Sequence, residues 1–104
     1  MKDVVKKKVD DIVAAIDGGK KPEDFAAAAN EDPYVFIMEA NGKLLVHPTL
    51  VGQSLKEKAG PVFDKVMEGT PEGAYVRYEW GGAHKCTYSR KTKGGLIVGC
   101  GYNE

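Results

Sequence analysis

The sequence predicts an α+β domain built on a five-stranded antiparallel sheet. Up to Asp17, apolar side chains recur with the period of a helix. From Tyr34 onward, short apolar runs are separated by glycine, proline and asparagine, as in strands joined by turns. The length of 104 residues predicts a single domain over residues 1–104, with helices within 1–30 and the sheet-forming part at 34–102.

The N-terminal helix is expected to run from Met1 to Asp17, where Gly18-Gly19 ends it. Its apolar residues fall on one face: Val5, Val9, Ile12, Val13 and Ile16. The lysines at 6–8 lie mostly on the other face beside acidic residues, which indicates a solvated surface rather than a nucleic-acid or membrane patch. A second short helix is expected from Pro22, because acidic residues follow it in the first turn.

A hairpin is expected next. The run Tyr34–Met38 is apolar throughout, which is typical of a strand covered on both faces. Asn41-Gly42 is a strong signal for a tight turn, and it leads into a second strand at Leu44–Val46. His47-Pro48 ends that strand, because proline cannot donate to the ladder.

A helical crossover and a three-stranded meander complete the chain. The stretch from Thr49 to Gly60 predicts a loop and a short helix, and Pro61 starts a further helix. Strands are expected at 75–80, 85–89 and 96–102, joined by a connection at 81–84 and by the loop 91–95. Both connections suit hairpins, so the sheet is predicted to be antiparallel.

Composition excludes several classes of function. Lys+Arg and Asp+Glu both number 15, whereas a generic nucleic-acid binder carries excess positive charge. No stretch approaches the ~20 apolar residues that span a bilayer, and no apolar signal core starts the sequence, so membrane insertion is not expected.

The charges are unevenly spread: residues 85–104 hold four basic residues and one acidic residue, whereas 31–79 hold five basic and eight acidic residues.

The sequence contains no motif that indicates catalysis or cofactor binding. The sequence has neither a GxSxG elbow nor a phosphate-binding loop, and two histidines with two cysteines at separate places do not form a metal-site pattern. Asp64 and Glu68 lie one helical turn apart, as surface carboxylates often do. His47 is best explained as a structural histidine that bonds its neighbouring loop. An enzyme is therefore not expected.

The C-terminal strands carry the most suggestive chemistry. Strand alternation places Tyr78 and Trp80 on one face, and Lys85, Tyr88 and Tyr102 lie on neighbouring strands. Aromatic walls, hydroxyl groups and an ammonium group suit a pocket for a small carboxylate or an amino acid. The alternative is that these aromatic residues are simply well suited to a half-buried pleat.

The two cysteines lie on the last two strands. If the loop 91–95 joins those strands, Arg90 faces Leu96, Tyr88 faces Val98, and Cys86 stands directly opposite Cys100. Directly opposed residues are close enough for a disulfide after small adjustment. Two buried thiols are the alternative, because a change of register separates the pair.

In the order of the chain, five segments resemble the single-Cache family of bacterial and archaeal sensors. Tyr34–Pro48 is similar to its aromatic strand, Asn/Asp-Gly turn and strand end at proline, and Leu50–Leu55 to its glycine-containing loop. Gly73–Trp80 resembles its aromatic third strand, Lys85–Tyr88 its K-x-x-Y strand, and Val98–Tyr102, with the sequence V-G-C-G-Y, its closing v-g-x-G-i-Y strand. The likeness covers about two-thirds of the chain.

This resemblance implies a PAS-like, profilin-like sheet with the N-terminal helix on one face and a helix-containing crossover between the second and third strands. Small ligands of the family bind on the side of that crossover. It implies that Tyr78, Trp80 and Tyr88 wall a pocket, that Phe36 and Met38 form its floor, and that Lys85 pairs with a carboxylate. The expected ligand is a small organic acid or amino acid.

The resemblance also implies a non-catalytic role in signal transduction, in the periplasm or outside the cell, either free-standing or within a receptor. The segment Leu55–Gly60 is shorter than the corresponding family segment, which shortens the cover of the pocket. The second hypothesis is therefore an interaction or dimerisation module with a degenerate pocket, pairing through the N-terminal helix. An enzyme using Cys86 and Cys100 for redox chemistry ranks third.

Overall fold

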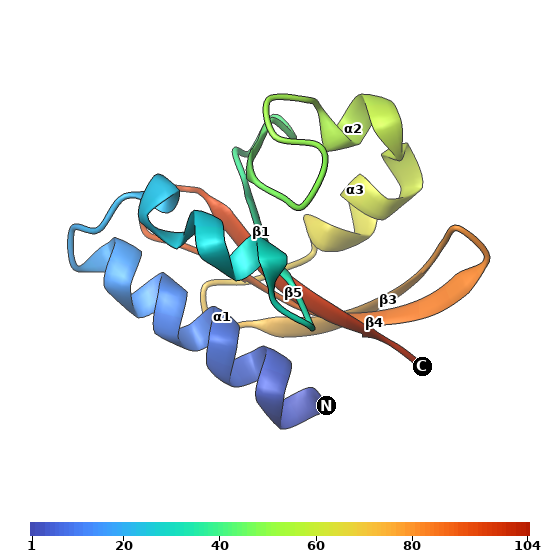
Figure 1. Cartoon of the computed structure of the whole chain (residues 1–104), viewed down its shortest axis with the longest axis horizontal. Coiled ribbons are helices and arrows are strands. Elements are labelled where there is room, and N and C mark those ends of the chain that lie inside the picture. The colour runs from blue at the N-terminus through green and yellow to red at the C-terminus, as the bar shows by residue number, and fades with distance from the viewer.

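The computed structural model describes all residues from Met1 to Glu104. Its elements are α1 (Lys2–Asp17), the 3-10 helix η1 (Pro22–Asn30), β1 (Val35–Met38), β2 (Leu44–Val46), α2 (Leu55–Lys58), α3 (Gly60–Val66), β3 (Ala74–Trp80), β4 (Ala83–Lys91) and β5 (Ile97–Asn103). The five strands form one antiparallel sheet in the order β2-β1-β5-β4-β3 (Figure 1). The predicted α+β class and five-stranded antiparallel sheet are confirmed.

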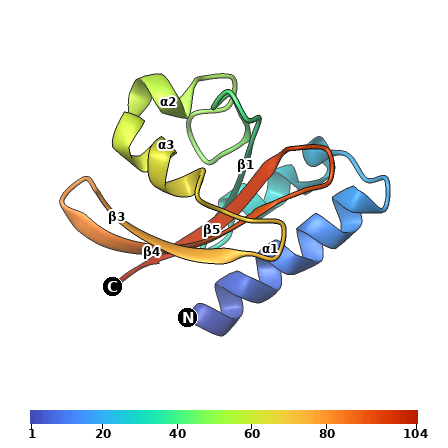
Figure 2. The same cartoon turned by 180° about the vertical axis from the view of Figure 1, so that it is seen from behind.

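Helices α1 and η1 cover one face of the sheet (Figures 1 and 2). The apolar stripe of α1 is buried, and Val5 and Val9 are fully inaccessible to solvent. These side chains form one hydrophobic cluster with residues of the central strands, among them Val35, Ile37 and Val98. The helix thus uses its apolar face against its own sheet.

Helices α2 and α3 cover the opposite face (Figure 2). Leu55 of α2 and Val66 of α3 join a second hydrophobic cluster with Phe36, Met38 and Ile97 of the sheet. Because strand residues alternate between faces, β1 contributes its even-numbered residues to this cluster and its odd-numbered residues to the first one. This explains why Val35–Met38 is apolar without interruption.

Glycines form the two tight hairpins. At the β1–β2 turn, Gly42 has φ of 97°, and the Asn41 side chain accepts a hydrogen bond from the Lys43 amide at 2.9 Å. At the β3–β4 turn, Trp80 pairs directly with Ala83, so only Gly81 and Gly82 form the loop. Both have positive φ, as a type I′ turn requires. This turn is tighter than the predicted connection at 81–84.

The register between β4 and β5 differs from the prediction by two residues. Arg90 pairs with Val98, Tyr88 with Cys100, and Cys86 with Tyr102. The loop starts one residue later than expected because buried Thr92 closes it: the Thr92 amide donates to the Leu96 carbonyl, and the Leu96 amide donates to Thr92 Oγ1.

Of the two alternatives for the cysteines, the structure does not contain the disulfide. Cys86 and Cys100 are both free and fully buried, and in this register they stand diagonally rather than face to face. Burial raises the pKa of the Cys100 thiol to about 12. The alternative of two buried thiols is what the structure shows.

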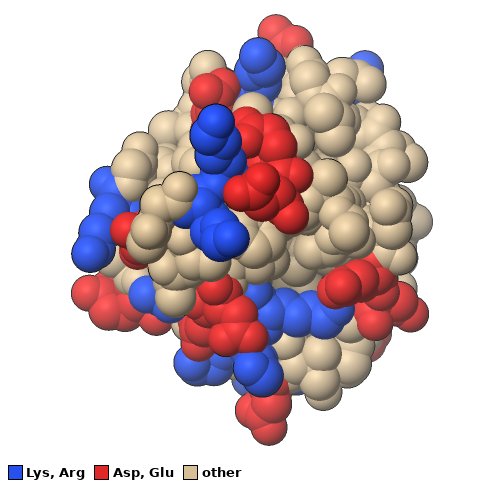
Figure 3. All heavy atoms as spheres, turned by 60° about the vertical axis from the view of Figure 1, so that its left-hand side comes forward, with Lys and Arg blue, Asp and Glu red and all other residues tan.

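Charged residues of both signs are interspersed on the face seen in Figure 3. Several are paired along α1, where Lys6 lies 2.6 Å from Asp10 and Lys7 lies 2.8 Å from Asp11. None of the helices combines the length and the apolar character that crossing a bilayer requires.

Candidate functional site

An apolar pocket lies between the sheet and the cover formed by α2 and α3. It holds about 260 Å³ of empty space, of which about 10 Å³ admits the centre of a water molecule. That is about the room one water needs, so the pocket is nearly closed. Its lining residues are Tyr34, Phe36, Leu44, His47, Leu55, Val62, Tyr78 and Trp80.

The central strand β5 has glycine at two positions on the face beneath this region. Gly99 and Gly101 of β5 face the same side as Phe36 and Thr87, with which they pair. A Cβ on Gly99 would lie 2.3 Å from Phe36 Cζ, and one on Gly101 would lie 2.3 Å from Thr87 Oγ1. The two glycines therefore let the Phe36 ring and the Thr87 hydroxyl settle onto the sheet below the pocket.

His47, one of the lining residues, is held in place by the loop that follows it. Its Nδ1 accepts hydrogen bonds from the amides of Thr49 and Leu50, each at 3.1 Å. Accepting at Nδ1 leaves the proton of the neutral ring on Nε2. Burial, and then the positive charge of Lys85, lower the pKa of His47, so the neutral ring is favoured. The predicted loop-bonding role of this histidine agrees with these contacts.

Lys85 is a half-buried cation without an ionic partner. Its Nζ lies 5.1 Å from the centre of the Tyr34 ring, and no carboxylate lies within 4 Å of it. Burial lowers the pKa of this amine. An unpaired ammonium group of this kind gains most from an anionic ligand, because its desolvation is not otherwise offset.

Tyr78 adds a hydroxyl group to the lining of the pocket. Its Oη lies 2.7 Å from Thr87 Oγ1 in a hydrogen bond. Burial raises the pKa of Tyr78 to about 12, and the bond to Thr87 offsets only part of that effect. The phenol therefore stays neutral at physiological pH. The pocket lining thus holds neutral polar groups of Tyr78 and His47 and no acid. Lys85 is not itself a lining residue, but it lies beside two of them, Tyr34 and Tyr78.

The structure brings together only part of the predicted ligand-binding set. Phe36, Tyr78 and Trp80 line the pocket. Lys85 pairs with Tyr78 across the β3–β4 ladder and so lies on the same face. Met38 is fully buried in the cluster below and does not line the pocket.

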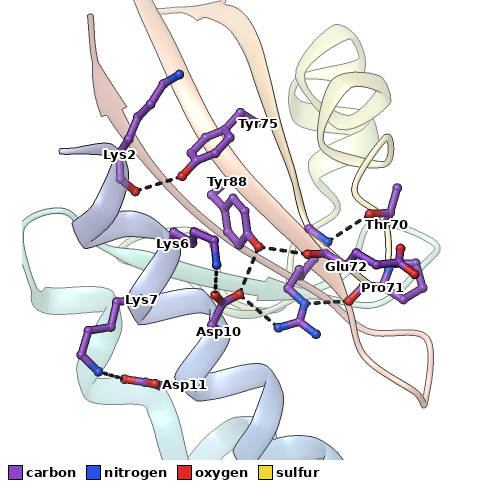
Figure 4. Close-up of polar contacts among 12 residues, drawn as sticks. Lys2, Lys6, Lys7, Asp10, Asp11, Thr70, Pro71, Glu72, Tyr75 and Tyr88 are labelled. Carbon is purple, nitrogen blue, oxygen red and sulfur yellow. Dashed lines mark hydrogen bonds and ion pairs between the residues drawn. The ribbon is translucent and has the colours of Figure 1, made fainter.

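The prediction that Tyr88 walls the pocket is wrong. Tyr88 lies three residues from Lys85 along β4, so it points to the opposite face of the sheet and joins the α1 cluster. Its hydroxyl donates to Asp10 Oδ1 and to the Glu72 carbonyl, each at 3.1 Å (Figure 4). Tyr88 thus ties α1 to the segment before β3.

Sequence reasoning did not assign five of the lining residues to the pocket: Tyr34, Leu44, His47, Leu55 and Val62. Tyr34 and Leu44 lay within segments used for the family resemblance, and that resemblance placed the ligand under the crossover that contains Leu55 and Val62. The predicted topology therefore indicated where these residues lie, whereas their residue types did not indicate that they line a pocket. No three His, Cys, Asp or Glu side chains gather into a group that could hold a metal ion.

Two solved structures share this fold. The ligand-binding domain of Mlp24 with asparagine superposes with a TM-score of 0.58 and 17% identity over 81% of this chain, which spans only 35% of that chain. A domain of an HTR-like protein from Haloarcula marismortui ATCC 43049 gives a TM-score of 0.52 and 16% identity, over 66% of this chain and 94% of that one. The PAS-like α+β fold is confirmed. No protein-family model and no curated protein matches the sequence.

Proposed function

We propose that this chain is a non-catalytic sensor domain of the Cache type, which binds a small organic acid in the pocket under α2 and α3. The observation that carries this proposal is the unpaired ammonium group of Lys85 beside an apolar pocket whose other polar edge groups are neutral. The shared fold with the ligand-binding domain of Mlp24 supports a binding role. We further propose that the domain works in signal transduction outside the cytoplasmic membrane.

An organic acid suits this pocket better than an amino acid. A carboxylate can pair with Lys85 and accept from His47 Nε2–H, while an apolar tail contacts Phe36 and Trp80. An amino acid would also bring an ammonium group, and the lining residues offer it no carboxylate. Leaving that charge unpaired in an apolar site is costly.

Binding requires the cover to open, because the closed pocket has room for about one water. The cover consists of a four-residue and a seven-residue helix. Few polar contacts hold it: Leu55 N–H donates to the Gly42 carbonyl at 2.8 Å, and Ser89 Oγ–H donates to the Val66 carbonyl at 2.9 Å. Outward movement of these short helices enlarges the pocket without disturbing α1.

A titration with straight-chain monocarboxylates from acetate to hexanoate, with the matching amides as neutral controls, tests the proposal. A ligand at a hundred times its Kd stabilises the native state by about 2.7 kcal/mol, which for a domain of this size raises the melting temperature by about 10–20 °C. We expect the acids to produce a rise and the amides to produce none. Asparagine and glutamine serve as the amino-acid arm.

Variants locate the binding site. Lys85→Gln is expected to weaken binding about tenfold or more, since a charge-assisted hydrogen bond contributes about 1.5–3 kcal/mol. Lys93→Gln removes an exposed lysine from the β4–β5 loop, at the opposite end of β4 from Lys85, and should leave the affinity unchanged. Equal loss of affinity in both variants would contradict a specific role of Lys85.

The nearly closed pocket also favours a second function, an interaction module without a small-molecule ligand. If it dimerises through α1, the contact must use the charged outer face, since the apolar face is already buried. The same titration separates the two functions: no stabilisation by any acid or amino acid favours the interaction module.

A further inference from the structure

The two edge strands of the sheet, β2 and β3, differ in whether their outer backbone groups are hydrogen-bonded within the chain. At one edge, β2 is only three residues long, and the loop that follows it closes its outer side. The Leu44 amide donates to the Gln53 carbonyl at 2.9 Å, and the Gly52 amide donates to the Leu44 carbonyl at 2.8 Å. This edge is not available to another strand.

The other edge, β3, is open. It has seven residues, and all of them pair with β4 in a continuous register without a bulge. Apart from its ladder with β4, no backbone N–H or C=O group of residues 74–80 makes a hydrogen bond within the chain. Long, regular, uncovered edges of this kind are templates for pairing with another strand, and proline or bulges usually block them.

We propose that β3 pairs with β3 of a second copy of this chain, antiparallel about a two-fold axis at Tyr78. In a symmetric antiparallel pair, opposed residues share a face, so their residue numbers add up to an even sum. Few registers meet this condition. The charges of the strand decide among them.

The charged side chains of β3 are Arg77 and Glu79, and their side chains are 57% and 69% exposed. An axis at Arg77 would place the two Arg77 side chains opposite each other, which is destabilising. An axis at Val76 would leave both charges without an opposed partner. Only the axis at Tyr78 places each Arg77 opposite Glu79 of the other copy, which gives two complementary pairs.

The same register aligns apolar residues on the other face of the sheet. Val76 of each copy stands opposite Trp80 of the other copy, and the two Tyr78 residues meet at the axis. Within one chain, Arg77 contacts Glu104 at 3.0 Å and His84 contacts Glu79 at 3.5 Å. These exposed pairs contribute little, so exchanging them for contacts between copies costs little.

The paired ladder is short, and we expect weak, concentration-dependent association. The proposed pairing is argued from the strand edge and its charges and does not depend on the proposed sensor function. Because Tyr78 and Trp80 also line the pocket, the two pockets of the pair lie on either side of the axis.

Charge exchange tests this pairing by sedimentation equilibrium up to about 1 mM, where an association of about −4 kcal/mol is half complete. We expect the unaltered chain to dimerise. Arg77→Glu and Glu79→Arg each replace both complementary pairs with like charges, so each variant should be monomeric. An equimolar mixture of the two variants restores two opposite-charge pairs and should form heterodimers.

Matched controls exclude a general effect of charge. Lys7→Glu and Asp11→Lys change the net charge by the same amounts on the outer face of α1 and should dimerise as the unaltered chain does. Glu104→Gln removes the intrachain partner of Arg77 and should also dimerise. Circular dichroism confirms that each variant is folded. A monomeric unaltered chain at 1 mM, or a mixture that stays monomeric, overturns the proposal.

Discussion

At the residue scale, Asp10 holds more of the molecule together than its place on a helix surface indicates. Its carboxylate accepts from Lys6, Arg90 and Tyr88 at distances of 2.6 to 3.1 Å (Figure 4). Arg90 Nε also donates to the Pro71 carbonyl at 2.7 Å. One carboxylate thus joins α1 to β4 and, through Arg90 and Tyr88, to the segment that leads into β3.

The pKa of Asp10 reflects these contacts. Burial raises it, but the hydrogen bonds from Lys6, Arg90 and Tyr88 outweigh burial and lower the pKa below its usual value. A carboxylate with a lowered pKa stabilises the folded state above the pKa it has in the unfolded chain. This contribution disappears as the pH falls through the folded pKa.

Replacing Asp10 by Asn is expected to lower the free energy of unfolding by about 1.5–3 kcal/mol at neutral pH, because charge-assisted hydrogen bonds are lost. The difference from the unaltered protein should shrink as the pH falls from about 4 through the lowered pKa of folded Asp10, because protonation removes the charge that Asn also lacks. Urea denaturation at several pH values measures both effects.

Asp11→Asn is the matched control, since Asp11 is 64% exposed and bonds only Lys7 of the same helix. Its effect should stay below about 0.5 kcal/mol. Equal effects of the two substitutions would contradict the bridging role of Asp10.

The residues of the candidate site show how far sequence reasoning reaches. Strand alternation correctly places Tyr78 and Trp80 on one face. The same alternation separates Lys85 from Tyr88, which lies three residues later, but the family resemblance assigned both residues to the pocket. The roles of Gly99 and Gly101 are set by residues opposite them on other strands, and local sequence does not reveal such pairing.

At the element scale, helix and strand positions follow from periodicity, whereas register does not. The α1 stripe, the β1–β2 turn and the predicted strands all recur in the structure within a few residues. The β4–β5 register depends on where Thr92 closes the loop, and a shift of the loop by one residue moves every pair by two. The possible pairing of Cys86 with Cys100 depended directly on this register, so the shift of two residues separates them.

The observed register predicts the behaviour of both thiols. Alkylation of the native protein without reductant is expected to label neither Cys86 nor Cys100, because both are fully buried and the raised pKa of Cys100 suppresses its thiolate. In denaturant, still without reductant, both should react. Mass spectrometry counts the labels, and an unlabelled pair in denaturant would instead reveal a disulfide.

At the scale of the whole molecule, two separate hydrophobic clusters lie on the two faces of one sheet. The cluster beneath α1 contains no pocket, whereas the cluster beneath α2 and α3 borders one. We therefore expect α1 to contribute mainly to stability, whereas the proposed binding site lies on the opposite face. Changes to α1 and changes to α2 or α3 should therefore have different consequences for stability and for binding.

Removal of residues 1–17 is expected to abolish cooperative folding. The α1 side chains Val5, Val9, Ile12 and Val13 are buried, and burying such a side chain contributes about 1.5–3 kcal/mol. The total is comparable with the whole stability of a small domain, about 5–15 kcal/mol. Circular dichroism during thermal unfolding measures the loss, and a cooperative transition in the shortened chain would contradict this role of α1.

The strand order also determines when the chain can fold during its synthesis. The β1–β2 and β3–β4 hairpins are not hydrogen-bonded to each other; β5 lies between β1 and β4 and pairs with both. A ribosome adds about 5–20 residues per second, so the first hairpin waits several seconds for residues 97–103. Until that strand emerges, both apolar layers lie open on the nascent chain, and the domain closes only after residues 97–103 have been made.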